Sequence, residues 1–456
     1  MDRLMVGVSG VRGTVGRTLT PRVACDFGCA FGTMLGAGKT VALGRDSRTS
    51  GPTLRSAVLA GLLGTGVNVI DLGIVSTPAA ALMTSKLECD GGVILTASHN
   101  PAQYNGVKFL RPSGVGLSAA GAQRLKEIWQ AGDYAFADQD SQGTATTNTT
   151  AAASYVEAVC AYCDVEAVGR GGFMVVLDST NGAGGPSAKL LFERLGCELV
   201  HLNAEPHGRF AHPPEPVEEN LSELCAAVRE HGAAVGFAQD ADADRLAIVD
   251  ERGRFIGEEY TLALAAAFVL GKRAGRMATN LATSRMIDDL AERHGCDVVR
   301  SPTGEANVVD AMVRDGCIFG GEGGGGVIDP RIVPVRNSLS GMAMVLQHLA
   351  ETGKTVSQLV DDIPRYVMLK TKMPCPPGAA EKIARRAREV FAGREGVRFN
   401  DADGLRVDLP GRWVCVRASN TEPILRIIAE APTQADADAL VAETRAVADA
   451  VIATKT

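Results

Sequence analysis

The stretch Gly92-Val93-Ile94-Leu95-Thr96-Ala97-Ser98-His99-Asn100-Pro101 places small polar residues directly after a short apolar run. Similar apolar runs occupy residues 40–43 and 67–72, and helical stretches follow at 53–63 and 78–87. Such an alternation is typical of βα units around a largely parallel sheet. The first part of the chain is therefore predicted to be an α/β domain.

The alternation returns twice, with cycles that begin near Phe173 and Tyr260, and the pattern changes after Pro364. The last part contains strand-like segments and two helical segments, at residues 405–409, 413–417, 425–430, 379–391 and 436–452. This order predicts three α/β domains and a small α+β domain with an antiparallel sheet. A chain of 456 residues has room for roughly three or four domains. The polar segment 138–150 is predicted to be a linker or surface loop.

Composition narrows the classes of function. Hydrophobic residues make up 46% of the chain and charged residues 22%, which excludes extensive disorder. The net charge of −7 disfavours nucleic acid as a partner. No apolar run approaches the roughly 20 residues that span a bilayer, so no membrane association is expected. Eleven scattered cysteines without framework spacing are expected to stay reduced, and we predict a cytoplasmic protein.

Ser98 is the first candidate for chemistry. A serine at the carboxyl end of a parallel strand lies at the edge where α/β proteins place their active sites. The small residues Ala97 and Pro101 should leave its hydroxyl accessible, and His99 or Lys108 could bias its protonation. A simple turn that ends the strand would explain any one of these residues but not the whole string. We therefore predict a reactive hydroxyl at Ser98.

A second candidate is the loop Asp240-Ala241-Asp242-Ala243-Asp244-Arg245, which follows a strand-like run. Alternating aspartates in an extended loop point their carboxylates the same way, and such oxygen ligands suit Mg²⁺ or Ca²⁺. An EF-hand is excluded because Arg245 stands where glycine is needed and both flanks are strand-like. Three solvated aspartates without a metal are the remaining alternative.

Two further clusters suit the binding of small ligands, one an anion and the other a sugar. The turn Arg417-Ala418-Ser419-Asn420-Thr421-Glu422-Pro423, with Arg426 following, combines guanidinium groups, hydroxyls and backbone N–H groups into an anion cradle. The run Gly320-Gly321-Glu322-Gly323-Gly324-Gly325-Gly326 sets one carboxylate among glycines, where it suits hydrogen bonding to sugar hydroxyls. Taken alone, each could equally be an ordinary turn or a flexible loop.

Together these motifs resemble those of the α-D-phosphohexomutases, the family that contains phosphoglucomutase, phosphomannomutase and phosphoglucosamine mutase. The resemblance covers almost the whole chain in order, at residues 8–13, 44–51, 96–101, 105–108, 178–182, 240–245, 321–325 and 417–423. It implies three related α/β domains with mixed sheets and a C-terminal α+β domain around a central cleft. The implied division is a phosphoserine domain, a Mg-binding domain, a sugar-binding domain and a phosphate-binding domain, at 1–150, 151–253, 254–363 and 364–456.

The resemblance implies an isomerase that interconverts hexose 6-phosphate and hexose 1-phosphate by intramolecular phosphoryl transfer. Ser98, carried as phosphoserine, would phosphorylate the hexose phosphate substrate, and the hexose 1,6-bisphosphate intermediate, also the activator, would return its other phosphate. Mg²⁺ would be held by Ser98 together with Asp240, Asp242 and Asp244. The other implied site residues are Arg12 and Arg245 near the transferred group, Arg45, Glu322 and Gly324 for the substrate, and Arg417, Ser419, Asn420, Thr421 and Arg426 for the second phosphate.

The sugar loop departs from the commonest family form. Many relatives carry a serine at the place of Gly324 and a histidine at the place of Gly326, whereas this chain resembles the G-E-G-N-G-G form of archaeal-type members. Without that histidine, Lys108 is the chief candidate for the acid/base and His99 the second. This form of the loop favours phosphoglucosamine as substrate.

Other functions remain open at this point. A phosphomannomutase or phosphoglucomutase of broad specificity is the first alternative. A Mg-dependent sugar phosphatase and a sugar-phosphate-binding module without chemistry are the others. The oligomeric state cannot be read from the sequence.

Overall fold

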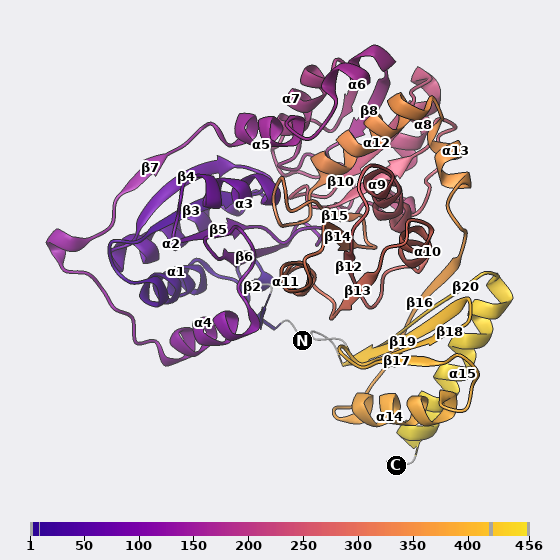
Figure 1. The fold of residues 1–456 in the computed structure, drawn as a ribbon. Coiled ribbons are helices and arrows are strands. Elements are labelled where there is room, and N and C mark those ends of the chain that lie inside the picture. The colour runs from indigo at the N-terminus through magenta and orange to yellow at the C-terminus, as the bar shows by residue number, and fades with distance from the viewer. Residues whose placement is uncertain (1–2, 9, 419–422, 454–456) are drawn as a thin grey trace.

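The computed structural model describes residues 3–8, 10–418 and 423–453. Their strands form four separate sheets, each with its own helices (Figure 1). Among these residues, no helix is both long and apolar enough to cross a membrane. The predicted fold class, three related α/β domains and a C-terminal α+β domain, is confirmed.

The first sheet has seven strands in the order β1-β2-β6-β5-β3-β4-β7. Strands β5, β3, β4 and β7 run parallel, whereas β6, β2 and β1 pair in antiparallel fashion, so the sheet is mixed. The strands are β1 Met5–Gly7, β2 Gly10–Thr14, β3 Thr40–Arg45, β4 Asn68–Ile74, β5 Gly91–Leu95, β6 Tyr104–Leu110 and β7 Ala145–Thr147. Its helices are α1 Pro21–Leu35, α2 Gly51–Gly64, α3 Thr77–Lys86 and α4 Ala119–Ala131.

The polar segment 138–150 is more ordered than a linker. Its residues Ala145–Thr147 pair in parallel with β4 and form the edge strand β7. The strand is fully exposed, which explains why its sequence lacks large apolar residues. A polar edge strand on an apolar neighbour is hard to detect from sequence, because no periodicity marks it.

The second and third sheets share one plan: three parallel strands and a fourth, antiparallel strand that forms a hairpin with the third. The second sheet comprises β8 Met174–Asp178, β9 Glu198–Leu202, β10 Val235–Gln239 and β11 Leu246–Val249, with helices α5 Ala151–Cys160, α6 Val165–Gly171, α7 Gly185–Leu195 and α8 Ser222–His231. The third comprises β12 Met277–Asn280, β13 Val298–Ser301, β14 Phe319–Glu322 and β15 Gly326–Ile328, with helices α9 Glu258–Lys272, α10 Met286–Arg293, α11 Glu305–Asp315, α12 Ser338–Thr352 and α13 Val356–Asp361. One continuous apolar core joins the two units, so their strand ends are held in a fixed relation.

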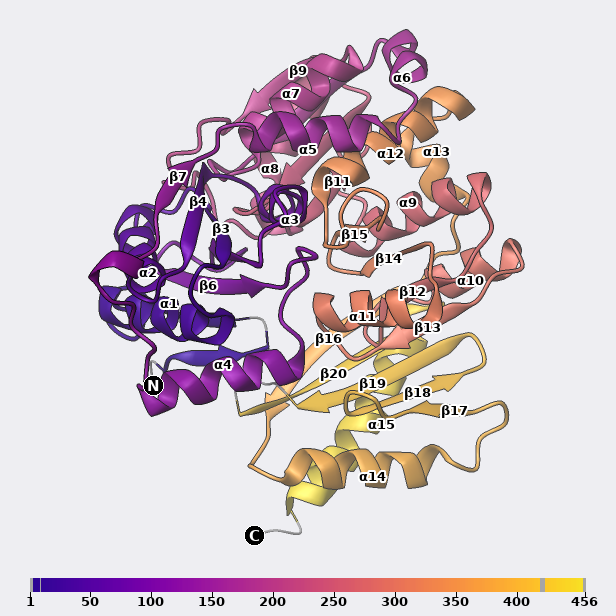
Figure 2. The ribbon, with the colours of Figure 1, turned by 60° about the vertical axis from the view of Figure 1, so that its left-hand side comes forward.

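The fourth sheet is antiparallel, as predicted, in the order β16-β20-β19-β18-β17. It comprises β16 Val367–Pro374, β17 Arg398–Asn400, β18 Leu405–Leu409, β19 Arg412–Ala418 and β20 Ile424–Ala431, with helices α14 Ala379–Phe391 and α15 Gln434–Ala453. The two helices cover one face, and the other face lies toward the third unit (Figure 2). Buried Arg406 links the fourth sheet to the third unit by donating a 2.6 Å hydrogen bond to the carbonyl of Leu281.

Candidate active site

Ser98 lies in the loop after β5 with a φ of 51°, a left-handed conformation that L residues adopt at a cost in strain. Its Oγ donates a 2.7 Å hydrogen bond to Oδ2 of Asp240 and lies 3.2 Å from Nδ1 of His99. The residue is only 1% exposed. The expectation of an accessible hydroxyl is therefore wrong for this structure, because the carboxylate of Asp240, in the loop after β10 of the second sheet, covers it.

Arg48 holds the Ser98 loop in place. The guanidinium donates to the carbonyls of Ser98 at 2.7 Å, Asn100 at 2.6 Å and Pro101 at 2.9 Å. It is itself fixed by Asp46 at 3.0 Å, and both side chains are buried. These bonds offset the strained backbone at Ser98, so Arg48 acts on the loop through its main chain.

The three aspartates of the loop after β10 converge. Asp240, Asp242 and Asp244 are buried, and one carboxylate oxygen of each lies within 4.8 Å of the others. The Oδ1 atoms of Asp242 and Asp244 are buried without a hydrogen-bond partner. Orphaned carboxylate oxygens in a dry site are unfavourable unless a cation meets them, so this donor set fits a divalent metal.

The remaining oxygens of these aspartates are held by neighbours from other elements. Oδ2 of Asp242 accepts from the Thr77 hydroxyl at 2.6 Å and from Nζ of Lys108 at 2.8 Å. Oδ2 of Asp244 accepts from Arg336 at 2.7 Å. Each of these two carboxylates thus has one oxygen held by hydrogen bonds and one buried oxygen without a partner, and the hydrogen bonds fix the orientation of the group.

Burial and charge shift the titration of the cluster. Burial raises the pKa of Asp240 well above its usual range, and the charges of Asp242 and Asp244 add to the effect. Burial acts in the same direction on Asp242, but the Lys108 ammonium and its hydrogen bond keep the pKa of Asp242 below its usual range. The charges of Asp242 and Asp244 in turn raise the pKa of Lys108, against the effect of burial, so Lys108 is an ammonium here.

Two cations, Arg12 and Arg245, lie close to the residues that follow Ser98. Arg12, on β2, donates to Oδ1 of Asn100 at 2.9 Å, and burial lowers its pKa. Nε of Arg245 is buried without a partner. Burial and the charges of Arg245 and Arg12 lower the pKa of His99 to about 2, so its ring is neutral. Positive groups near a serine hydroxyl, with one guanidinium nitrogen still without a partner, are suited to an anion such as phosphate.

Glu322 is buried at the end of β14, and most of its hydrogen-bonding capacity is used. Oε1 accepts from Nδ2 of Asn280 at 2.7 Å and from the Gly304 amide at 3.0 Å, and Oε2 accepts from Arg336 at 3.1 Å. One acceptor position therefore remains, on Oε2. A Cβ at Gly324 would lie 3.8 Å from Nη1 of Arg245, so the glycine-rich loop of Glu322 is adjacent to Arg245.

Arg417 and Arg426 are cross-strand partners in the β19–β20 pair, and Lys372 is the partner of Arg426 on β16. Three cations thus lie in a row on one face of the fourth sheet. Nε of Arg417 lies 3.3 Å from Oδ2 of Asp403 as an ion pair, although it is not aligned for a hydrogen bond. The predicted residues Ser419, Asn420 and Thr421 lie outside the described residues.

Four family models together cover nearly the whole chain. They are phosphoglucomutase/phosphomannomutase domain I at residues 3–135, domain II at 153–253, domain III at 257–366 and the C-terminal domain at 369–447. The chain belongs to the phosphoglucomutase/phosphomannomutase family. It is therefore an enzyme of the phosphohexomutase type, as the sequence motifs predicted.

Relatives of the family match along their full length. A phosphoglucomutase/phosphomannomutase of Thermococcus kodakarensis is 40% identical over 436 residues, 94% of this chain and 95% of that protein. A probable phosphoglucosamine mutase of Methanopyrus kandleri is 37% identical over 434 residues, 94% of each. The crystal structure of a family protein from Burkholderia thailandensis, 28% identical, superposes with a TM-score of 0.86 and covers 98% of this chain and 97% of that one.

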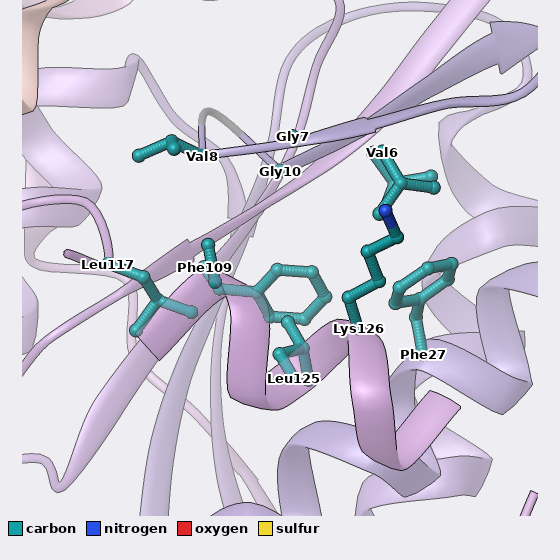
Figure 3. Close-up of a pocket in the computed structure, with 11 residues that line it drawn as sticks. Val6, Gly7, Val8, Gly10, Phe27, Phe109, Leu117, Leu125 and Lys126 are labelled. Atoms are coloured by element: carbon teal, nitrogen blue, oxygen red, sulfur yellow. The ribbon is translucent and has the colours of Figure 1, made fainter. Parts of the chain in front are cut away.

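Two cavities lie apart from this phosphohexomutase site. Apolar side chains beneath the β1–β2 hairpin line a pocket of about 10 Å³, room for about one water molecule (Figure 3). An open surface pocket of about 250 Å³ lies between β11 and α13, where Arg254 pairs with Asp250 and Arg365 with Asp361. The first is too small for a sugar phosphate, and the charges of the second already satisfy one another.

The family resemblance also indicated Arg45, whose surroundings differ from those of the other site residues. Its guanidinium donates to the carbonyl of Asp46 at 3.1 Å, and Asp71 and Arg55 are its other charged neighbours. A substrate-binding role for Arg45 stays a prediction. Three site neighbours were not singled out from the sequence, namely Arg48, Thr77 and Arg336.

Proposed function

We propose that this phosphohexomutase interconverts hexose 6-phosphate and hexose 1-phosphate through a phosphoserine at Ser98 and a bound hexose 1,6-bisphosphate. The observation that carries the proposal is the Ser98 hydroxyl, which donates to Asp240 of the three buried carboxylates, with Arg12 and Arg245 close enough to lower the pKa of the neighbouring His99. A nucleophile, a set of metal-binding carboxylates and an anion site thus come together where the loop after β5 contacts the loop after β10. Catalysis of phosphoryl transfer depends mainly on such positioning and charge stabilisation.

The residues present fit Mg²⁺. Asp240, Asp242 and Asp244 would hold the ion together with an oxygen on Ser98, and the orphaned Oδ1 atoms of Asp242 and Asp244 support this assignment. When bound, the ion would neutralise charge on the phosphoryl group. Lys108 and Thr77 keep Asp242 oriented, and Arg12 and Arg245 supply positive charge from the protein itself.

In the proposed reaction, a sugar hydroxyl takes the phosphoryl group of Ser98 and gives its proton to a base, while the serine Oγ–P bond breaks and the freed oxygen takes up a proton to become the hydroxyl that donates to Asp240. The bisphosphate then reorients and its other phosphoryl group passes to Ser98 Oγ, which releases its proton, while the sugar oxygen left behind takes up a proton. Lys108, as an ammonium near the site, is the proposed donor of that proton, and His99, whose ring is neutral, is the second candidate for the acid/base role and would act as the base. Oδ2 of Asp240 accepts from the serine hydroxyl, and Nδ1 of His99 lies 3.2 Å from the same serine oxygen.

We propose that the four predicted segments divide this work. Residues 1–150 carry Ser98, 151–253 the metal loop, 254–363 the sugar loop with Glu322 and Gly324, and 364–456 the second phosphate site. The row of Arg417, Arg426 and Lys372 supports the last assignment. A single anion site at the far end of the sugar would let the same molecule bind in two orientations. A cytoplasmic location stays a prediction.

Arg417→Ala is expected to raise KM by roughly 10- to 100-fold, because a charge-assisted contact to the non-reacting phosphate is lost. It should also lower kcat, since that phosphate helps to hold the sugar for in-line transfer. A coupled mutase assay over a range of hexose phosphate concentrations measures both. Arg412→Ala is the matched control, because Arg412 lies at the other end of β19 and pairs with Asp436. An unchanged KM for Arg417→Ala would refute the anion-cradle assignment.

Among the sugars, we propose glucosamine 6-phosphate as the preferred substrate. The support is the glycine-rich form of the Glu322 loop and the relatives named as probable phosphoglucosamine mutases. The relative at 40% identity carries the phosphoglucomutase/phosphomannomutase name, which favours a broad enzyme as the second candidate.

The measurement is kcat/KM for glucosamine, glucose and mannose 6-phosphates, with inorganic phosphate release followed in parallel. We expect glucosamine 6-phosphate to lead by more than about tenfold, equivalent to roughly 1.4 kcal/mol. Ratios within that range would indicate a broad hexomutase. Phosphate release at the rate of substrate loss would indicate a phosphatase instead.

A further inference from the structure

Arg336 lies in the loop between β15 and α12 and contacts carboxylates from three different elements. Its Nη2 donates to Oδ2 of Asp244 at 2.7 Å, its Nη1 to Oε2 of Glu322 at 3.1 Å, and its Nε to Oε2 of Glu305 at 3.2 Å. The Arg336 backbone amide also donates to Oε2 of Glu305 at 2.9 Å. The side chain is 15% exposed, so one buried guanidinium joins the metal loop to the sugar loop.

Gly326 makes room for this guanidinium. It is the β15 partner of Glu322 in the β14–β15 hairpin, and the side chain of Arg336 packs against it. A Cβ on Gly326 would lie 2.8 Å from Cγ of Arg336 and would clash still more closely with Cδ. Any side chain at position 326 would therefore push Arg336 away from its carboxylates, so Gly326 and Arg336 form a steric pair.

The charges explain why Arg336 stays in this place. Burial alone would lower the pKa of Arg336, but the charges of Asp244, Glu305 and Glu322 raise it well above its usual range. A planar guanidinium can bond to several carboxylates in fixed directions at once, whereas an ammonium acts as a point charge. Arg336 is thus suited to hold Asp244 and Glu322 in one defined relation.

We propose that Arg336 is a positioning residue that aligns the metal-binding Asp244 with the sugar-binding Glu322, and that Gly326 is required for it. The inference rests on the proposed function, because it assigns the metal to Asp244 and the sugar to Glu322. The bond to Oδ2 of Asp244 fixes the orientation of a carboxylate whose Oδ1 is buried without a partner, and the bond to Oε2 of Glu322 fixes the orientation of that carboxylate. One side chain thereby fixes the position of the metal-binding carboxylate relative to the sugar-binding carboxylate.

The activity test is a double-mutant cycle of Arg336→Ala, Gly326→Ala and the double variant. Each single change should lower kcat/KM by about 100-fold, the effect of misplacing reacting groups by about 1 Å. The double variant should be no worse than Arg336→Ala, because the added methyl group at position 326 then has no guanidinium to displace. Arg336→Lys should recover part of kcat, since a lysine can hold one of the carboxylates. Arg314→Ala, an exposed arginine of the same unit, is the control.

A second readout does not depend on turnover. Calorimetric titration with Mn²⁺ alone should show tighter binding to Arg336→Ala, by about threefold or more, because Asp244 loses its competing cation. Gly326→Ala should shift the affinity in the same direction. Tighter metal binding with slower turnover is the signature of a positioning residue, whereas general disruption of the site would weaken metal binding.

Three results would overturn the inference: unchanged kcat/KM in Arg336→Ala, additive effects of the two substitutions, or weaker Mn²⁺ binding in Arg336→Ala with an unchanged melting temperature. Failure of the proposed function is a separate result. It would appear as wild-type protein that interconverts none of the hexose phosphates. Wild-type turnover with an additive cycle would refute the role of Arg336 alone.

Discussion

Ser98→Ala should abolish hexose phosphate interconversion, with a loss on the order of 10⁴-fold or more. The Ser98 Oγ is the atom that would carry the phosphoryl group, and alanine leaves nothing to accept it. The other groups around it, Asp240, Arg12 and Arg245, would retain their ability to bind a sugar phosphate. The measurement is the coupled mutase assay, together with the intact mass of wild-type and variant chains. Only the wild type should contain a fraction heavier by one phosphoryl group.

The fold of this variant should survive. The Ser98 loop is held through its carbonyls by Arg48, and the substitution leaves those bonds in place. Asp240 loses one donor to a buried oxygen, which costs about 1–3 kcal/mol of unfolding free energy. Ser56→Ala on the exposed face of α2 is the matched control for activity. Near-normal turnover of Ser98→Ala would remove the phosphoenzyme mechanism.

Asp242→Asn should lower activity by at least about 100-fold at limiting Mg²⁺, since losing even an outer partner of a metal ligand costs about 10- to 100-fold. The substitution keeps the shape of the side chain but removes one of three anionic ligands. Oδ1 of Asp242 is a buried oxygen without a hydrogen-bond partner, so its charge is available only to a cation. Lys108, which pairs with Oδ2, would lose the charge that fixes it.

Two measurements test this variant: activity as a function of Mg²⁺ concentration, and calorimetric binding of Mn²⁺ without sugar. Both should shift to higher metal concentration in Asp242→Asn. Asp310→Asn serves as control, because Asp310 pairs with Arg111 on the surface, away from the cluster. If metal affinity stayed the same in Asp242→Asn, the aspartate loop would need a role other than metal binding.

Local sequence signals were enough for most of the elements and for the order of the candidate site residues along them. The alternation of short apolar runs and helical stretches predicted the α/β units, and helix 379–391 was predicted with the bounds of α14. The strand-like flanks of the aspartate loop are β10 and β11, which excludes an EF-hand. These features depend on neighbours in the chain, so the sequence pattern is sufficient to find them.

Residues that act across long separations could not be found in this way. Thr77 and Asp242 are 165 positions apart, Arg48 and Ser98 are 50 apart, and Arg336 and Asp244 are 92 apart. Each of these residues is common as a helix or loop residue, and nothing local marks it as a partner of the site. Two signals could have indicated Arg48: the polar run 46–49 after β3, and the resemblance of residues 44–51 to a family motif.

The sequence alone determined which groups are present at the strand ends: a serine, three alternating aspartates, a carboxylate among glycines and an arginine-rich turn. Only the tertiary structure decided that Ser98 is buried against Asp240, and that the absence of a side chain at Gly326 leaves room for Arg336. The physical reason is that chain neighbours decide secondary structure, whereas burial, charge pairing and steric fit arise where separate sheets meet. A glycine in the sequence shows that a side chain is missing, but only the packed structure shows which residue occupies that space.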